Sequence, residues 1–264
     1  MTQKFQPREM ERLMAAIARV EGPMLNDLAP PPDRKRPLNS RERRAIYSHK
    51  LKVPAELNGQ GRIAEHLLKG LFYEANLLVH IWQADIPGIY LDVGANVGNH
   101  MAFFAHKTRA SHVFAFEPVC EHVGSCLDIA RLNGFPHKVS VVPFAVAEHP
   151  GMINFTYQLL DHYPKRTAAA VRLDDVVPPG VGLIKMDIEG GEPAALRGAT
   201  RILSQDRPAL YIEAHDDAAL DELMSVLRPF AYELTGAVFN ASPTYEIVPS
   251  EKLEYFEDIQ SEHN

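Results

Sequence analysis

The stretch Ile89-Tyr90-Leu91-Asp92-Val93-Gly94-Ala95-Asn96-Val97-Gly98-Asn99 predicts the fold of this chain. Residues 89–92 have the apolar character of a short buried strand, Gly94 and Gly98 bracket a tight turn, and residues 101–105 follow as the core face of a helix. Glycine allows the sharp bend and leaves the amides at the helix start open to a ligand. We interpret the stretch as a strand-to-helix nucleotide loop, although an ordinary strand-turn-helix corner has the same pattern.

The next predicted strand strengthens this interpretation. Residues 112–116 are again apolar, and the strand ends at Glu117, which lies 19 residues after Gly98. An acid at about this distance accepts hydrogen bonds from ribose hydroxyls in dinucleotide-type folds. Asn96 replaces the glycine that lets a pyrophosphate approach, so the loop suits a ligand without phosphates. A nicotinamide-dependent oxidoreductase remains the main alternative enzyme class, because it shares this order of elements.

A resemblance to a known family rests on three motifs that occur in the same order. They are the loop 92–98, Phe116-Glu117-Pro118, and Ile184-Lys185-Met186-Asp187-Ile188-Glu189-Gly190-Gly191-Glu192. Together they resemble the FkbM family of S-adenosylmethionine-dependent methyltransferases. The resemblance implies an α/β fold with a doubly wound, Rossmann-like class I methyltransferase sheet, mostly parallel with an antiparallel last strand. It also implies O-methylation of a hydroxyl on a small molecule or sugar.

The cofactor residues expected on this basis lie at the carboxyl ends of the first three strands. The loop would hold the methionine end of S-adenosylmethionine, Glu117 the ribose hydroxyls, and Ala145 and Val146 the adenine side. The full expected set is Asp92, Gly94, Ala95, Asn96, Gly98, Asn99, Glu117, Pro118, Ala145, Val146 and Asp187. A protein that binds this cofactor without catalysis is an alternative outside enzymology.

Acidic residues also follow the two later strands of the predicted parallel sheet. Residues 181–186 lead to Asp187, and the strand 209–213 ends in Glu213, with His215 two residues beyond. Such a group can serve as a general base or bind a hard divalent metal ion. We therefore predict Asp187, Glu213 and His215 as catalytic residues. The sequence assigns no metal ligands but leaves magnesium or manganese open as a further cofactor; if magnesium were present, its ligands would be Asp187, Glu189 and Glu213.

The sequence suggests three segments: an N-terminal extension (1–58), a methyltransferase domain (59–249) and an acidic tail (250–264) that we expect to be exposed. The extension combines an amphipathic helix at 7–20, a proline run and an arginine cluster at 34–44. A solvated linker beside a packing helix is the simpler interpretation. The alternative is that the extension covers the active site or forms a homodimer, with its arginines meeting an acidic or phosphorylated substrate.

Periodicity predicts further elements of the domain. Residues 62–82 keep a helical rhythm that Gly70 interrupts, which suggests two helices. Other helices are expected at 120–132, 194–203 and 217–227, a polar loop at 158–169, and a final antiparallel pair of strands from 230–239 and 245–248.

Composition limits the classes of function. The 264 residues include 27 basic and 34 acidic side chains, a net charge of −7 that argues against a broad nucleic-acid interface. No apolar run reaches the ~20 residues of a membrane span, and the N-terminus lacks the apolar core of a signal peptide. We expect a cytoplasmic protein that acts on a small-molecule or sugar hydroxyl. Cys120 and Cys126 face different sides of a predicted helix, so no disulfide is expected between them.

Overall fold

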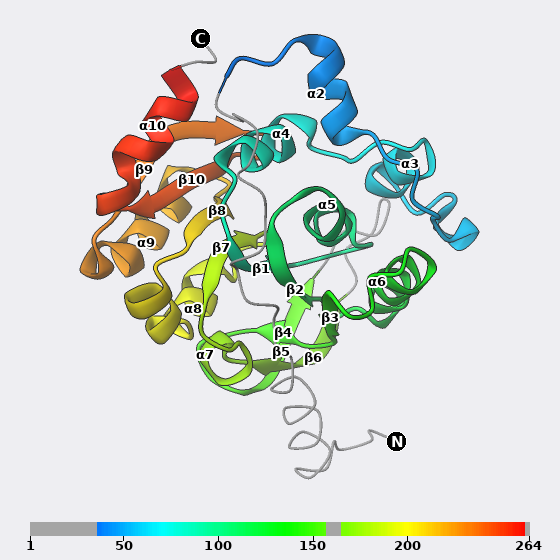
Figure 1. The fold of residues 1–264 in the computed structure, drawn as a ribbon. Coiled ribbons are helices and arrows are strands. Elements are labelled where there is room, and N and C mark those ends of the chain that lie inside the picture. Colours follow the sequence, from blue (N-terminus) through cyan, green and yellow to red (C-terminus); the bar gives the residue numbers. More distant parts are fainter. Residues whose placement is uncertain (1–35, 157–164, 262–264) are drawn as a thin grey trace.

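The computed structural model describes residues 36–156 and 165–261, and a seven-stranded sheet forms the centre of this part (Figure 1). The strand order is β3-β2-β1-β7-β8-β10-β9, and only β10 and β9 run antiparallel to their neighbours. These strands are β1 (Gly88–Val93), β2 (Ala110–Phe116), β3 (Val139–Val142), β7 (Val181–Met186), β8 (Ala209–Glu213), β9 (Tyr232–Phe239) and β10 (Thr244–Pro249). The predicted doubly wound sheet with an antiparallel end is confirmed.

Both faces of the sheet are apolar, because successive strand residues alternate between two hydrophobic cores. Tyr90 faces the first core and Leu91 the second. The first core lies beneath α2 (Ser40–Tyr47), α3 (Arg62–Leu68), α4 (Ala75–Ala84), α5 (Asn99–Lys107), α6 (Cys120–Leu132) and α10 (Leu253–Ser261). The second lies beneath α7 (Leu173–Val176), α8 (Glu192–Arg197) and α9 (Asp217–Leu227). Figure 1 shows α5 and α6 on one side of the sheet and α8 and α9 on the other.

A small second sheet extends the molecule beyond β3. Its strands are β4 (Ala145–Val146), β6 (Lys165–Val171) and β5 (Gly151–Thr156), in that order. The polar loop predicted at 158–169 is therefore wrong for its last five residues, which pair with β5 in a hairpin. Their side chains at 165–167 are exposed, so the backbone bonds to β5 hold the start of β6 without an apolar pattern. Residues 158–164 lie outside the described residues, as does the helix predicted at 7–20.

The helices predicted at 120–132 and 217–227 have the expected bounds, as α6 and α9. Residues 62–82 form α3 and α4, with the break after Leu68 and Gly70 at φ +74°. The helix predicted at 194–203 is interrupted: α8 ends at Arg197, and a π-helix, η3 (Ile202–Asp206), follows. Shorter turns are η2 (Ala55–Leu57), η4 (Arg228–Phe230) and η5 (Ser250–Lys252).

The acidic C-terminal segment differs from its prediction. Residues 253–261 form α10 rather than an exposed tail, and Phe256 and Ile259 are buried in the first core. The apolar residues that pack lie three positions apart, a spacing too short to stand out among the surrounding acids. No helix among the described residues has both the length and the apolar character needed to cross a membrane.

Candidate active site

The loop between β1 and α5 has the conformation that its sequence predicts. Gly94, Asn96 and Gly98 all have positive φ angles, of 86°, 49° and 90°. Two of these positions are glycines because this region of backbone conformation disfavours side chains, and asparagine tolerates it better than most residues. The loop lies at the point where the strand order reverses between β1 and β7, which is where doubly wound sheets bind ligands.

Close packing is a second reason for these glycines. A Cβ atom on Gly94 would lie 1.9 Å from the carbonyl oxygen of Asp187, and one on Gly98 would lie 3.2 Å from Sγ of Cys126. The amides of Gly94 and Ala95 both donate to the carbonyl oxygen of Phe116. The glycines therefore serve the joint between the loop and its neighbouring strands as well as any ligand.

Glu117 follows β2 and holds the loop in place. Its Oε2 accepts a hydrogen bond from the amide of Asn96 at 2.7 Å, and its Oε1 accepts one from the amide of Val119 at 2.8 Å. His122 Nδ1 lies 3.5 Å from the same Oε1. Because each carboxylate oxygen has two lone pairs, Glu117 can still accept hydrogen bonds from ribose hydroxyls.

A buried charge cluster lies beside this loop. Asp92 of β1 and Lys185 of β7 are neighbours in the strand register, and both are buried. Asp92 Oδ2 accepts a hydrogen bond from the amide of Met101 at 2.7 Å, whereas Oδ1 has no partner among the described residues. Burial raises the pKa of Asp92. Lys185 Nζ lies 3.3 Å from Asp187 Oδ2 and so supplies the compensating charge.

The predicted catalytic residues lie together at the carboxyl ends of β7 and β8. Burial and the adjacent Asp187 carboxylate raise the pKa of Glu213 to about 7. Burial alone would raise the pKa of Asp187 as well, but the Lys185 charge lowers it below its ordinary value. His215 is exposed at the rim, with Nε2 3.5 Å from Glu213 Oε2 and Nδ1 3.1 Å from the Ser242 hydroxyl. The site thus contains one carboxylate that stays ionised and one that titrates near neutral pH.

Three members of the cluster were not predicted from the sequence: Lys185, Glu74 and His100. His100 lies in the first turn of α5, and its Nε2 is 2.9 Å from Glu74 Oε2. Burial would raise the pKa of Glu74, but the hydrogen bond and charge of His100 lower it. Glu74 also interacts electrostatically with Lys185 and Asp187. In the structure Glu74 is marked by its positive φ of 61° directly before α4, but nothing in the sequence indicates this.

The remaining predicted residues have structural partners. Asn99 Oδ1 accepts a hydrogen bond from the amide of Tyr73 at 2.9 Å, and its Nδ2 donates to the Tyr73 carbonyl oxygen. Ala145 and Val146 form the buried strand β4, beside β6. Pro118 is half-buried next to Glu117.

The loop after β7 contains two glutamates with different surroundings, one buried and one exposed. Glu192 is buried at the start of α8, and its Oε1 accepts a hydrogen bond from the amide of Ile188 at 2.8 Å, so this acid holds the loop that precedes the helix. Glu189 is exposed, with Oε2 3.6 Å from His215 Nε2. Across residues 36–156 and 165–261, no three His, Cys, Asp or Glu side chains form a group that could hold a metal ion. Asp187, Glu189 and Glu213 therefore do not form the magnesium site considered above.

Comparisons with known proteins give the chain a family. Residues 92–234 match the family model described as the methyltransferase FkbM domain. Among solved structures, a methyltransferase FkbM from Methylobacillus flagellatus KT is 22% identical, with a TM-score of 0.51 over 61% of this chain and 43% of that one. The tRNA methyltransferase TrmK of B. subtilis is 14% identical, with a TM-score of 0.46 over 67% of this chain and 64% of that one. No curated protein matches.

Proposed function

The chain belongs to the family of FkbM methyltransferase domains, and from this premise we propose that it transfers a methyl group from S-adenosylmethionine to a hydroxyl oxygen of a small molecule or sugar. Methyltransferase activity and the cofactor follow from the family. The kind of acceptor atom is our proposal, and it rests on the paired carboxyl groups of Asp187 and Glu213. A hydroxyl must lose its proton as it attacks, so such a site needs a base.

The residues around the loop fit this cofactor chemically. When bound, S-adenosylmethionine supplies a methyl group on a positively charged sulfonium. The carboxyl groups beside the loop outnumber the one lysine there, Lys185, and this balance favours a ligand with positive charge. These carboxyl groups belong to Asp92, Glu74, Asp187 and Glu213. The unused lone pairs of Glu117 are suited to ribose hydroxyls, and the strand β4 at Ala145 and Val146 would border the adenine.

Glu213 is the proposed base, and Asp187 positions and polarises it. With a pKa of about 7, a Glu213 carboxylate can take a proton at neutral pH and release it again. Lys185 keeps Asp187 ionised, and the Asp187 charge in turn raises the proton affinity of Glu213. His215 lies 3.5 Å from Glu213, where it can pass the proton to solvent. Because the donor is already activated, the remaining contribution of the protein is alignment of the two reactants.

The observation that carries the proposal is the position of the Asp187–Glu213 pair at the same sheet edge as the glycine loop and Glu117. A calorimetric titration with S-adenosylmethionine, S-adenosylhomocysteine and NAD tests the cofactor. We expect both adenosyl ligands to bind and NAD not to bind. Glu117→Gln should weaken the adenosyl ligands by about tenfold to a hundredfold, the effect of losing hydrogen bonds to a charged group.

Glu121→Gln is the matched control, because Glu121 is exposed on α6 and its ion pair with Arg166 is long, at 3.7 Å. It should leave the affinity unchanged. Binding of NAD alone would favour the oxidoreductase and refute the proposal. Adenosyl binding without transfer of a labelled methyl group to any of a broad panel of hydroxyl compounds would favour a protein that only binds.

Location and assembly remain predictions. The negative net charge supports a small-molecule substrate over nucleic acid, and we propose a cytoplasmic protein. A homodimer formed through residues 1–58 is the corresponding prediction for assembly, which light scattering of the full chain would test.

A further inference from the structure

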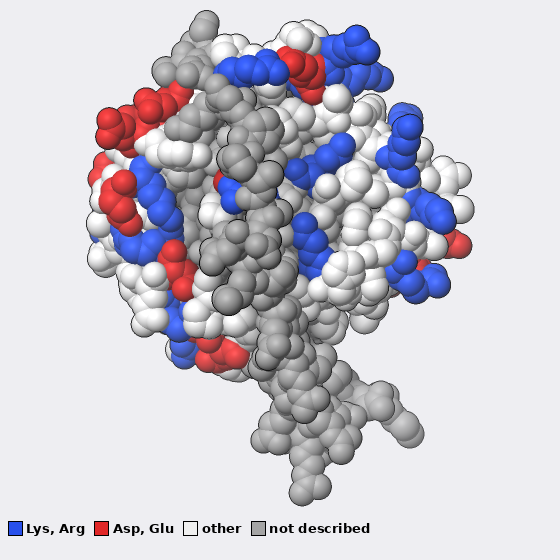
Figure 2. Space-filling view, viewed as in Figure 1, with Lys and Arg blue, Asp and Glu red and all other residues white. Residues whose placement is uncertain are grey.

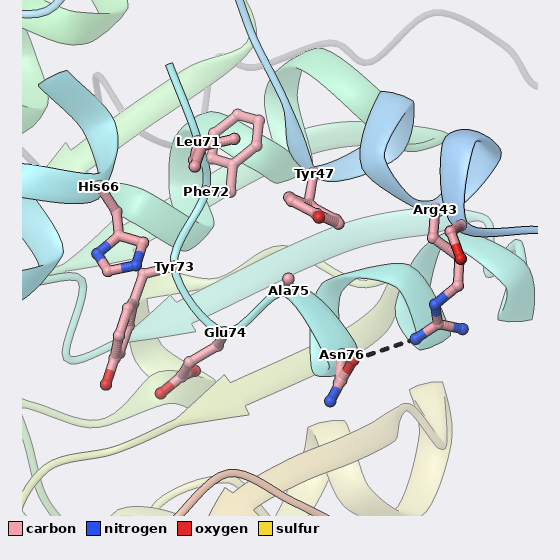
Figure 3. A pocket seen from close by; sticks show the side chains of 10 residues that line it. Arg43, Tyr47, His66, Leu71, Phe72, Tyr73, Glu74, Ala75 and Asn76 are labelled. Atoms are coloured by element: carbon pink, nitrogen blue, oxygen red, sulfur yellow. Dashed lines mark hydrogen bonds between the residues drawn. The ribbon is translucent and has the colours of Figure 1, made fainter. Parts of the chain in front are cut away.

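A pocket of about 390 Å³ lies between α2 and the segment that leads into α4 (Figure 3). Ser40, Arg43 and Tyr47 form one wall, because residues three and four apart share a face of α2. The opposite wall and floor are His66, Leu71, Phe72, Tyr73, Glu74, Ala75 and Asn76. The volume is enough for a small metabolite but not for a large one.

Residues at the inner end of this pocket contact residues of the candidate active site. Tyr73 shares two hydrogen bonds with Asn99, which opens α5 directly after the glycine loop. Glu74 lies 2.9 Å from His100 on the same turn and interacts electrostatically with Lys185 and Asp187. A molecule in the pocket would thus extend from α2 towards the catalytic carboxylates.

The outer end carries a cation that no carboxylate of the described residues neutralises. Arg43 donates one hydrogen bond, from Nη2 to Asn76 Oδ1 at 3.1 Å, and no carboxylate within residues 36–156 or 165–261 forms an ion pair with it. A guanidinium has five N–H donors in a fixed fork that matches a carboxylate or phosphate. Lys and Arg side chains gather over α2 and α3 in Figure 2, whereas acidic side chains gather over α10. The field at this end therefore attracts an anion.

The charge at the inner end is different. Glu74 is acidic and lies 2.9 Å from His100 Nε2. Phe72 and the two tyrosines supply flat walls, and Ser40, Tyr47 and Tyr73 bring hydroxyl groups. The pocket is thus polar at both ends and aromatic between them, with its uncompensated charge at Arg43.

We infer that this pocket binds the methyl acceptor and that the acceptor is a small hydroxy compound with a carboxylate or phosphate group, held by Arg43. The anion would lie against Arg43 and Asn76, so that the far end of the molecule, with its hydroxyl, points past Glu74 towards Asp187 and Glu213. The inference rests on the proposed function and gives it a substrate class.

A matched set of three-carbon ligands tests this inference on the full-length protein loaded with S-adenosylhomocysteine. Glycerol, glycerate and glycerol 3-phosphate have the same skeleton and differ in the anionic group. We expect saturable binding of one or both anions, at least about tenfold tighter than glycerol, as a charge-assisted hydrogen-bonded pair predicts. The better of the two anions identifies the group as carboxylate or phosphate.

Arg43→Gln should remove the preference for the anion and leave the affinity for S-adenosylhomocysteine unchanged. Arg43→Lys keeps the charge but loses the fork, so it should retain only part of the preference. Arg44→Gln is the control, since Arg44 is exposed at the next position of α2. Equal binding of glycerol and the anions, or no binding of either anion to protein that binds S-adenosylhomocysteine, would overturn the inference. Failure to bind S-adenosylhomocysteine would instead overturn the proposed function.

Discussion

The titration of Glu213 is a property of single side chains and can be tested without the acceptor. Burial and the Asp187 charge raise the pKa of Glu213 from 4.5 to about 7. Between these pH values the unfolded chain releases the proton while the folded protein retains it, so Glu213 reduces stability progressively as pH rises, and the loss levels off above about pH 7. We predict that Glu213→Gln gains stability relative to the parent protein over this interval.

Two measurements check this pH dependence. Urea unfolding at several pH values gives the difference in stability, and ¹³C NMR of the glutamate carboxyl groups should show one signal titrating near pH 7 that Glu213→Gln lacks. Glu121→Gln should retain that signal. A parent spectrum in which every glutamate titrates below pH 5 would contradict the assignment of Glu213 as the base.

Lys185 is the residue on which the other charges depend. Attraction to Asp187, Asp92 and Glu74 raises its pKa despite burial that alone would lower it. Lys185→Met would leave the buried Asp92 and the partly exposed Asp187 and Glu74 without their cation. We predict a loss of up to about 3–5 kcal/mol in the free energy of unfolding, the range for broken buried ion pairs. Lys69→Met is the control, because its ion pair with Glu65 is exposed and should contribute less than about 1 kcal/mol. Similar losses in both variants would refute this account.

The sequence predicts only part of this residue-level picture. Asp187 and Glu213 could be identified because each ends an apolar strand, and parallel strands bring such ends to one edge. Lys185 could not, since its role depends on the register that places it beside Asp92, on a strand far away in the sequence. Glu74 and His100 meet across two different helix starts, and no local pattern in either segment indicates the other.

At the level of elements, the joint between β1 and β7 depends on Gly94. An alanine there would combine a positive φ of 86° with a Cβ 1.9 Å from the Asp187 carbonyl oxygen. Strain of this kind costs about 1–3 kcal/mol before any clash is counted. We predict that Gly94→Ala unfolds at clearly lower urea concentration and loses cofactor affinity.

Gly124→Ala provides the matched control for Gly94. Gly124 lies within α6, and its added Cβ would meet no atom within 4 Å. Alanine there should stabilise the protein by about 0.4–1 kcal/mol. If both variants behaved alike, the close approach of the loop to β7 would not be what requires glycine at position 94.

Elements were predictable where their stabilising contacts follow a local pattern. The helices at 62–82 and 120–132 have long apolar periods, and β8 is an uninterrupted apolar strand, so all three agree with the structure. The strand β6 was missed because its start is held by backbone pairing with β5 rather than by apolar side chains. The helix α8 ends with Gly198 as its C-cap, whereas the segment after it depends on a distant residue, because Asp174 accepts hydrogen bonds from the amides of Arg201 and Ile202.

At the scale of the whole molecule, the antiparallel end of the sheet is tied to the helices that carry the acceptor pocket. Glu246 of β10 is fully buried, with Oε1 2.5 Å from His80 Nε2 of α4 and 2.8 Å from the Tyr211 hydroxyl. Its Oε2 accepts a hydrogen bond from the Thr235 hydroxyl. Because α4 begins at the pocket and ends near this network, the C-terminal strands and the acceptor site share one helix.

The C-terminal helix α10 completes the same assembly and gives the last prediction. Ile259 is fully buried, Phe256 is nearly so, and the Tyr255 hydroxyl donates to the carbonyl oxygen of Ala84 at the end of α4. Ile259→Ala should therefore cost about 2–5 kcal/mol, the range for a large-to-small change in a core. Glu257→Ala, at an exposed position of the same helix, should change stability by less than about 0.5 kcal/mol.

Urea unfolding of both variants tests whether α10 is a packed helix or a loose acidic tail. If α10 were a loose tail, the two substitutions would have equally small effects. If it belongs to the core, Ile259→Ala alone lowers stability, and because α10 packs on α4, it should also weaken binding of the three-carbon anions at the opposite end of that helix. The affinity for S-adenosylhomocysteine should change less, since Glu117 is hydrogen-bonded to the glycine loop and to the start of α6 rather than to α10.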